Sequence, residues 1–146
     1  MSQFRHIGIG DASFIADEDL SASSNRYKWV APTASVAGNV ELCTGASLPT
    51  PLGILQNSPC AGEEARVKIL GFSKMRVNTI QRGDTTSAST VQVSDYLMVA
   101  STADGRKAGG AASPAWARAL EAVASGSAII EVLILNNGGA NVVAAS

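Results

Sequence analysis

The chain contains few residues of the types that carry out catalysis, and its single histidine is the first of them to consider. His6 lies in the N-terminal stretch MSQFRHIGIGD. Catalysis of the Ser-His-Asp or Cys-His kind needs a histidine held rigidly beside its nucleophile. The apolar residues around His6 follow no sustained period, so no rigid element is predicted there. We therefore expect no catalytic role for His6.

Three consecutive carboxylates, Asp17 to Asp19, could suggest a calcium site. A calcium-binding loop instead spreads its ligands over about a dozen residues around a glycine. A solvated acidic turn fits this segment better. A more dispersed pair of carboxylates, of the kind that hydrolyses glycosidic bonds, is compatible with the sequence, but no aromatic-rich sugar platform accompanies it.

Short glycine motifs and the two cysteines give no stronger signal. The GIGD stretch at 8–11 lacks the preceding strand, the third glycine and the following helix of a phosphate-binding loop. QRGD at 81–84 is interpreted as a turn. Cys43 and Cys60 are too few and too far apart for a metal site, and we expect both to be reduced, small and buried. The sequence thus predicts no catalytic residue, no cofactor and no metal, and the protein is not expected to be an enzyme.

Composition excludes two classes of partner and favours a third. Eleven Lys and Arg are spread thinly against twelve Asp and Glu, giving a net charge of −1, so no basic face for nucleic acid is expected. No apolar run approaches the roughly 18 residues of a membrane span, and the N-terminus lacks the apolar core of a signal peptide. Small residues (24 Ala, 17 Ser, 14 Gly and 8 Thr) make up 63 of 146, which suits a surface that neighbouring proteins partly cover.

The chain is predicted to begin with an extended arm over residues 1–26. Ordering this backbone would cost roughly 25–50 kcal/mol, whereas burying its six apolar side chains would return only about 9–18 kcal/mol. The arm is therefore expected to order only by pairing with a partner's sheet edge, and deletion of residues 2–20 is expected to leave a folded domain. The candidate contact residues are Phe4, Ile7, Ile9, Phe14, Ile15 and Leu20.

The elements after the arm have the pattern of a compact β-domain over residues 27–135, followed by a glycine-rich flexible tail over 136–146. Short apolar segments recur with turn signals about every ten residues, which is typical of a small barrel or sandwich. Gly71 interrupts the alternating segment 65–80 and is expected to bend it. A tight hairpin is expected around Asp104-Gly105.

Residues 116–123 are ambiguous. Trp116, Ala119, Leu120 and Val123 have the i, i+3, i+4, i+7 spacing of an amphipathic helix, and periodicity alone predicts one. The helix would be barely two turns long and would run directly into the strand-like AIIEVLIL, so a β-hairpin also fits the segment.

Several stretches, taken in order, resemble the small capsid cement (decoration) proteins of tailed bacteriophages. The matching features are a Gly-Ile-Leu-Gln-Asn strand, a Pro-x-x-Gly-Glu turn, a Val-x-Ile-x-Gly strand, an Asp-Gly hairpin and an Arg-Ala-Leu-Glu-Ala run before a long apolar strand. They correspond to residues 53–57, 59–63, 67–71, 103–107, 118–122 and 129–135.

The resemblance implies an all-β fold, a small β-barrel or β-tulip-like domain; the extended N-terminal arm and the C-terminal tail, inferred above from the residues, lie outside the resemblance. It implies a structural protein on the outer surface of an icosahedral head, made in the host cytoplasm, that clamps neighbouring major capsid subunits, often as a homotrimer. It favours a strand over a helix for Trp116 to Val123. Ala117 departs from the family, in which a glycine tends to stand before the Arg-Ala-Leu-Glu run.

A second function remains open. A carbohydrate- or receptor-binding β-module on the virion would need an exposed aromatic platform, and the residues available for one are Tyr27, Trp29, Tyr96 and Trp116. Trp29 and Trp116 are otherwise interpreted as residues of the core or of a subunit interface.

Overall fold

The computed structural model describes residues 10–44, 50–79, 90–108 and 114–135. Within these ranges the chain forms ten β-strands, and the all-β prediction is confirmed. None of the described residues belongs to a helix that could cross a bilayer. The strands, in chain order, are β1 Asp11–Ala16, β2 Trp29–Pro32, β3 Asn39–Leu42, β4 Gly53–Leu55, β5 Glu64–Lys68, β6 Gly71–Asn78, β7 Tyr96–Val99, β8 Gly105–Lys107, β9 Ala117–Ala119 and β10 Ser127–Ile134.

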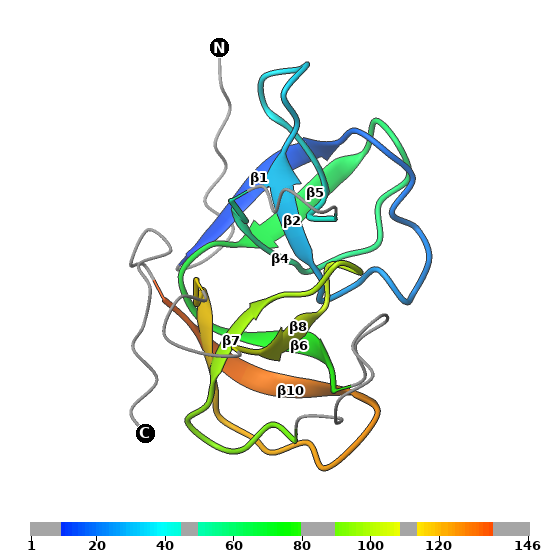
Figure 1. Cartoon of the computed structure of the whole chain (residues 1–146). Helices are drawn as coiled ribbons and strands as arrows, with labels where there is room; N and C mark the ends of the chain where they lie inside the picture. Colours follow the sequence, from blue (N-terminus) through cyan, green and yellow to red (C-terminus); the bar gives the residue numbers. More distant parts are fainter. Residues whose placement is uncertain (1–9, 45–49, 80–89, 109–113, 136–146) are drawn as a thin grey trace.

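The strands close into two five-stranded barrels, one above the other in Figure 1. Barrel A contains β1 to β5 in the ring order β1-β3-β2-β4-β5, and barrel B contains β6 to β10 in the ring order β6-β8-β7-β9-β10. The sequence predicted one barrel domain over residues 27–135. The structure corrects this to two barrels, because alternating apolar residues reveal strands but do not reveal which strands close a ring.

The two barrels have the same topology. Counted from its own first strand, each barrel is ordered first, third, second, fourth, fifth, and in each the first and third strands form a parallel pair. All other pairs are antiparallel. Parallel neighbours cannot be joined by a tight turn, and in each barrel the second strand, which pairs with the third as a hairpin, separates them along the chain.

The registers of the two barrels also correspond. Phe14 lies opposite Ala65 in barrel A, and Met75 lies opposite Ile130 in barrel B. If Phe14 and Ala65 of barrel A are matched with Met75 and Ile130 of barrel B, every other strand pair of barrel A falls on a strand pair of barrel B in the same register. These equivalent pairs are Ala16–Val40 with Val77–Gly105, Val30–Leu42 with Leu97–Lys107, Val30–Gly53 with Leu97–Ala117, and Leu55–Val67 with Ala119–Val132. Barrel B is therefore a structural repeat of barrel A.

Gly71 is the point at which the chain passes from barrel A to barrel B. Its φ is +86°, a left-handed conformation that glycine adopts without a steric penalty. The bend predicted at this residue is confirmed, and it has a larger consequence than a local kink: β5 and β6, which read as one alternating segment, belong to different barrels. Gly10, with φ +81°, precedes β1 as Gly71 begins β6.

The core has two parts that share a wall made of β2 and β4. Val30 and Leu55 point into barrel A, whereas Trp29 and Ile54, their chain neighbours, pack with the residues that fill barrel B. Both strands are buried on their two faces. A strand that is buried on both faces needs a continuous apolar run. This explains why β2 and β4 are apolar throughout and do not alternate with polar residues.

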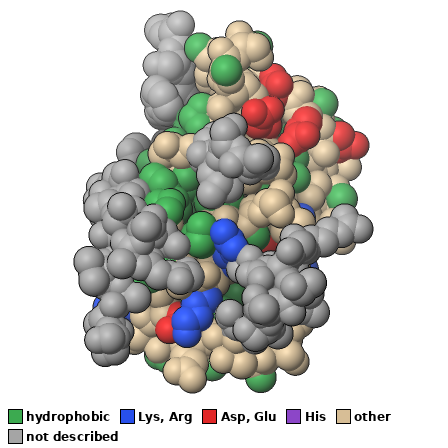
Figure 2. Space-filling model, viewed as in Figure 1, with side chains coloured by type: hydrophobic (Ala, Val, Ile, Leu, Met, Phe, Trp, Pro, Cys, Tyr) green, Lys and Arg blue, Asp and Glu red, His purple; other side chains and the backbone are tan. Residues whose placement is uncertain are grey.

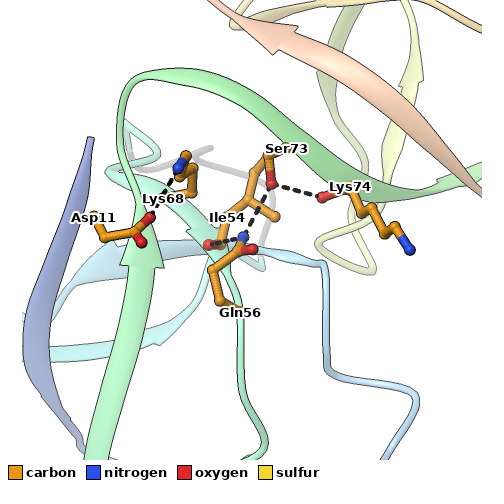
Figure 3. Close-up of polar contacts among 6 residues, drawn as sticks. All are labelled: Asp11, Ile54, Gln56, Lys68, Ser73 and Lys74. Carbon is orange, nitrogen blue, oxygen red and sulfur yellow. Dashed lines mark hydrogen bonds and ion pairs between the residues drawn. The ribbon is translucent and has the colours of Figure 1, made fainter. Parts of the chain in front are cut away.

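A partly buried polar contact joins the barrels at the same wall (Figure 3). The Gln56 side chain donates from Nε2 to the Ile54 carbonyl and to Ser73 Oγ, both at 2.9 Å. Ser73 Oγ in turn donates to the Lys74 carbonyl at 2.9 Å. Because each buried group has a partner, this contact avoids the cost of an unsatisfied polar atom and fixes β4 against β6.

The described part of the predicted arm belongs to barrel A, so the arm boundary at residue 26 was wrong. β1 pairs with β5 over five positions and with β3 over two. Residues 1–26 taken alone have no partner for their backbone, which is why a partner chain was expected. The chain supplies that partner itself, since β1 completes the ring. Residues 1–9 and 136–146 lie outside the described residues.

The segment from Trp116 to Val123 is not helical, and the strand that the resemblance favoured is present over part of it, followed by a bend at residues 120 and 121. Ala117 to Ala119 form β9, and Val123 makes a bridge with Val91. A hairpin is present where one was predicted around Asp104-Gly105, as β7 and β8, but its connection spans residues 100–104 and Gly105 is already the first residue of β8, paired with Val99. The helical spacing of apolar residues is overridden here because β9 is needed to close barrel B between β7 and β10.

Candidate interaction surface

The structure separates the predicted contact residues into three groups. Leu20 is 0% exposed and Phe14 is half-buried, and both pack in the core of barrel A. Leu20 is therefore a core residue and not a surface contact, which corrects that prediction. Ile15 is 42% exposed and stays a candidate. Phe4, Ile7 and Ile9 lie outside the described residues.

A group of exposed apolar residues lies where the chain crosses between the barrels. Ile69 is 37% exposed, Leu70 46% and Phe72 65%. Leu133, which is partly exposed, lies opposite Phe72 in the β6–β10 pair. We call these four residues the crossover surface. Figure 2 shows hydrophobic side chains exposed together near the level at which the two barrels meet.

The repeat shows that the fold does not require apolar residues on this surface. The positions of barrel A equivalent to Phe72 and Leu133 are Asp11 and Lys68, which also lie opposite each other. There they form an ion pair, with Lys68 Nζ 3.1 Å from Asp11 Oδ1 (Figure 3). Solvent-facing positions of a strand pair normally carry such polar residues. Barrel B thus exposes an apolar pair where the same fold accommodates a charged one.

Basic residues border the crossover surface on the outer face of barrel B. Lys74 is the next outward residue of β6 after Phe72, and Arg118 of β9 lies opposite Leu133. Both are exposed. Glu131 of β10 lies opposite Lys74 and is the acidic residue beside these two basic ones. The border of the surface is therefore basic on balance.

The opposite end of barrel A is acidic. Among residues 10–70, seven Asp and Glu stand against four Lys and Arg, a net charge of −3. Figure 2 shows acidic side chains gathered on this barrel. The acidic residues of barrel A are Asp11, Asp17, Glu18, Asp19, Glu41, Glu63 and Glu64, of which Asp11 lies at the other end of β1, in its ion pair with Lys68.

Two exposed apolar residues lie at this acidic end. Ile15 lies opposite Glu64 in the β1–β5 pair, and its N–H donates to the Gly38 carbonyl at 3.0 Å. Val36, in the turn that Gly38 ends, is 46% exposed. Asp17, two residues after Ile15, is also exposed. We call Ile15, Val36, Asp17 and Glu64 the acidic end.

Several acidic side chains around this end act as hydrogen-bond acceptors. Glu18 Oε1 accepts the Leu42 N–H at 2.8 Å, and Asp17 Oδ1 accepts from Asn39 Nδ2 at 2.8 Å. Asp19 accepts hydrogen bonds from Ser21, which lower the pKa of this carboxyl. The carboxylates thus hold the loop after β1 across the end of the barrel, in agreement with the solvated acidic turn that the sequence predicted.

The described residues contain no group of three His, Cys, Asp or Glu side chains placed to hold a metal ion. The two cysteines differ, and neither is in a disulfide. Cys43 is buried, and burial, with a smaller effect of Glu41, raises the pKa of its thiol to about 11. Cys60 is exposed, so the prediction that both are buried holds for Cys43 alone.

A polar depression on barrel A has its side chains engaged in the turn between β4 and β5. Asn57 Nδ2 donates to the Glu64 carbonyl at 2.8 Å, and Asn57 Oδ1 accepts the Arg66 N–H at 2.9 Å. Glu63 Oε2 accepts the Cys60 N–H at 2.8 Å. These contacts hold the turn that matches the Pro-x-x-Gly-Glu motif.

The aromatic residues do not assemble into an exposed platform. Trp29 is 1% exposed, and Tyr27, Tyr96 and Trp116 are half-buried. The guanidinium carbons of Arg26 and Arg118 lie 4.8 and 5.4 Å from the ring centres of Tyr27 and Tyr96, respectively. The described residues therefore give no specific support to a carbohydrate-binding module.

The crossover surface was not identified in the sequence, although a signal for it was present. From residue 65 to 77 the odd positions are apolar or small and face inward, apart from the bend. Leu70 and Phe72 place large apolar side chains at even positions on both sides of Gly71. Large apolar residues at positions where the alternating pattern calls for polar ones indicate an exposed apolar patch on a strand.

Comparison with known proteins gives a likeness to solved structures and none to a protein family. No protein family model and no curated protein matches the chain. A solved structure of the head fiber gp8.5 N base of bacteriophage phi29 has a TM-score of 0.56 with this chain at 13% sequence identity. The match covers 86% of this chain and 92% of the other. At this identity the likeness establishes a shared fold, and it extends over both barrels.

Proposed function

We propose that this chain is a structural protein of a phage head, which binds the outer surface of the capsid and joins neighbouring copies of the major capsid protein. The likeness to a phage head fiber base over most of both chains carries the proposal. The ordered cement-protein motifs in the sequence point the same way. The proposal also holds that the protein is not an enzyme.

The architecture suits a rigid connector. Both barrels are closed rings, so the described strands have no long free edge to which a partner strand could add. Docking must therefore use outward side chains and loops. Many equivalent weak contacts on a symmetric shell can together resist disruption without any single strong site, and two barrels fixed to each other by a shared wall would transmit load without bending.

Binding to empty sites on heads tests this proposal. Purified protein is mixed with phage heads that lack it, and bound protein is measured by co-sedimentation. We expect saturable binding at a fixed number of copies per head and a higher temperature of head disruption. Heads that already carry the protein are the matched control and should bind no more. Folded protein that fails to sediment with undecorated heads would refute the proposal.

The subunit state is tested separately. The proposal includes a homotrimer, for which light scattering should give three times the chain mass of 14.9 kDa. A measured mass of a single chain in solution would contradict a preformed trimer and would place assembly on the capsid itself.

A further inference from the structure

We propose that the crossover surface of one copy binds the acidic end of a second copy, so that chains associate head to tail. This goes beyond the proposed function, since it names an interface that capsid binding does not require.

The crossover surface has the features of a docking site for a protein. Its central residue, Phe72, is 65% exposed, and Leu70 beside it is 46% exposed. Aromatic anchors surrounded by polar groups are typical of the energetic centre of an interface. The equivalent pair in barrel A is Asp11 and Lys68, so the structure of the barrel does not demand this exposure.

The acidic end is complementary in charge to the crossover surface, and like that surface it exposes apolar side chains. Ile15 and Val36 provide exposed apolar side chains there, and the acidic groups Asp17 and Glu64 border Ile15. On the crossover surface the corresponding border is basic on balance, with Lys74 and Arg118 both exposed. Opposite charges at the rims of two apolar patches favour their encounter and fix their orientation.

The two surfaces of one chain cannot satisfy each other. Ile15 lies near the end of β1, whereas the crossover surface lies beside its start, where the Ile69 N–H donates to the Gly10 carbonyl at 2.8 Å. The four residue steps from Asp11 to Ile15 separate these ends by about 13 Å along the strand. The contact must therefore form between copies.

An interface between two different surfaces has a defined consequence for assembly. Each added copy leaves one crossover surface and one acidic end unfilled, so the association either closes into a ring or continues as an open chain. A closed dimer through one self-complementary patch is not expected.

Two variants, tested alone and mixed, examine this interface in the full-length chain. Phe72→Glu places a carboxylate on the crossover surface, where it repels the acidic end of the next copy. Ile15→Lys places an ammonium at the acidic end, where it can pair with Glu64 of its own strand pair and repels the basic rim. Phe72 is 65% exposed and Ile15 is 42% exposed, so neither substitution enters the core. Leu70→Glu is a second crossover variant if Phe72→Glu fails to fold.

The mass of each sample is measured by light scattering over a micromolar concentration series. We expect the wild-type protein to exceed twice the chain mass of 14.9 kDa and each variant alone to fall to the mass of a single chain. The equimolar mixture should reach the mass of two chains, because one intact surface remains on each variant. That restoration is specific to a head-to-tail contact.

Three results would overturn the inference. They are a wild-type protein that stays a single chain throughout the series, a folded Phe72→Glu variant with wild-type mass, and a mixture that remains monomeric. If Phe72→Glu keeps the wild-type mass but no longer binds undecorated heads, the crossover surface faces the capsid. That outcome refutes the self-contact and leaves the proposed function standing.

Discussion

Replacing Leu20 by alanine is the most direct test of the corrected position of the N-terminal segment. The leucine side chain is fully buried in barrel A with Val30, Val40 and Leu55. Its N–H donates to the Pro59 carbonyl at 2.9 Å, so the backbone at this position is fixed as well. Shortening the side chain leaves a cavity that this closed barrel can fill only in part.

The expected loss follows from this burial. Leu→Ala substitutions at fully buried sites cost about 2–5 kcal/mol, the removed transfer free energy plus the cavity. Barrel A is small and its strands are constrained on both sides, so we expect a loss near the middle of that range, about 3 kcal/mol. That is a large fraction of the roughly 5–15 kcal/mol by which native proteins are stable. It corresponds to a fall in Tm of about 10 °C for a chain of this size.

Denaturant unfolding, followed by tryptophan fluorescence, measures this loss. Trp29 lies in the wall between the two barrels, so its emission reports on the packing of both. The matched control is Ile15→Ala, which removes a large apolar side chain from the same segment at a position that is 42% exposed. We expect the control to lose less than about 1 kcal/mol.

The comparison of the two variants decides whether residues 10–26 are a free arm or part of the core of barrel A. If residues 10–26 were an arm that orders only on a partner, both substitutions would leave the free energy of unfolding unchanged. Equal, small effects of Leu20→Ala and Ile15→Ala would therefore refute the placement of this segment in the core.

The remaining predictions concern the closure of barrel A and its cysteines. Deleting residues 2–20 removes β1 and should prevent barrel A from folding, seen as lost amide-exchange protection in β3 and β5; a fully protected truncated chain would contradict this. Gly53→Ala directs a methyl group against the Lys68 carbonyl, and overpacking of this kind should cost about 1–3 kcal/mol in denaturant unfolding, whereas wild-type stability would show that β4 and β5 can separate. At pH 8 a thiol reagent should label Cys60 and leave Cys43 unmodified until the chain unfolds, as mass spectrometry would show. Because the raised pKa of Cys43, about 11, keeps its thiol protonated in the fold, stability should be complete below about pH 9 and fall from there to pH 11; a flat profile across this window would contradict that burial.

The sequence by itself determined the class of the fold and most of its local elements. Short alternating segments, a hairpin near Asp104-Gly105 and the bend at Gly71 were all read from residue types, because turn chemistry and a period of two are local properties. Residue types also predicted no catalytic constellation, and the ordered motifs resembling capsid cement proteins led to the expectation of a structural role.

Tertiary structure alone decided which strands meet. Periodicity predicted a helix at 116–123, but closing barrel B requires β9 there, and closing barrel A draws residues 11–16 into the fold. Both outcomes depend on strand pairs far apart in the sequence, whose hydrogen bonds a local pattern does not encode. The repeat of topology and register between the barrels, and the crossover surface that it reveals, likewise exist only once the two rings are closed. Ring closure is a global property of the chain, and it is what turned a predicted flexible arm into a wall of the first barrel.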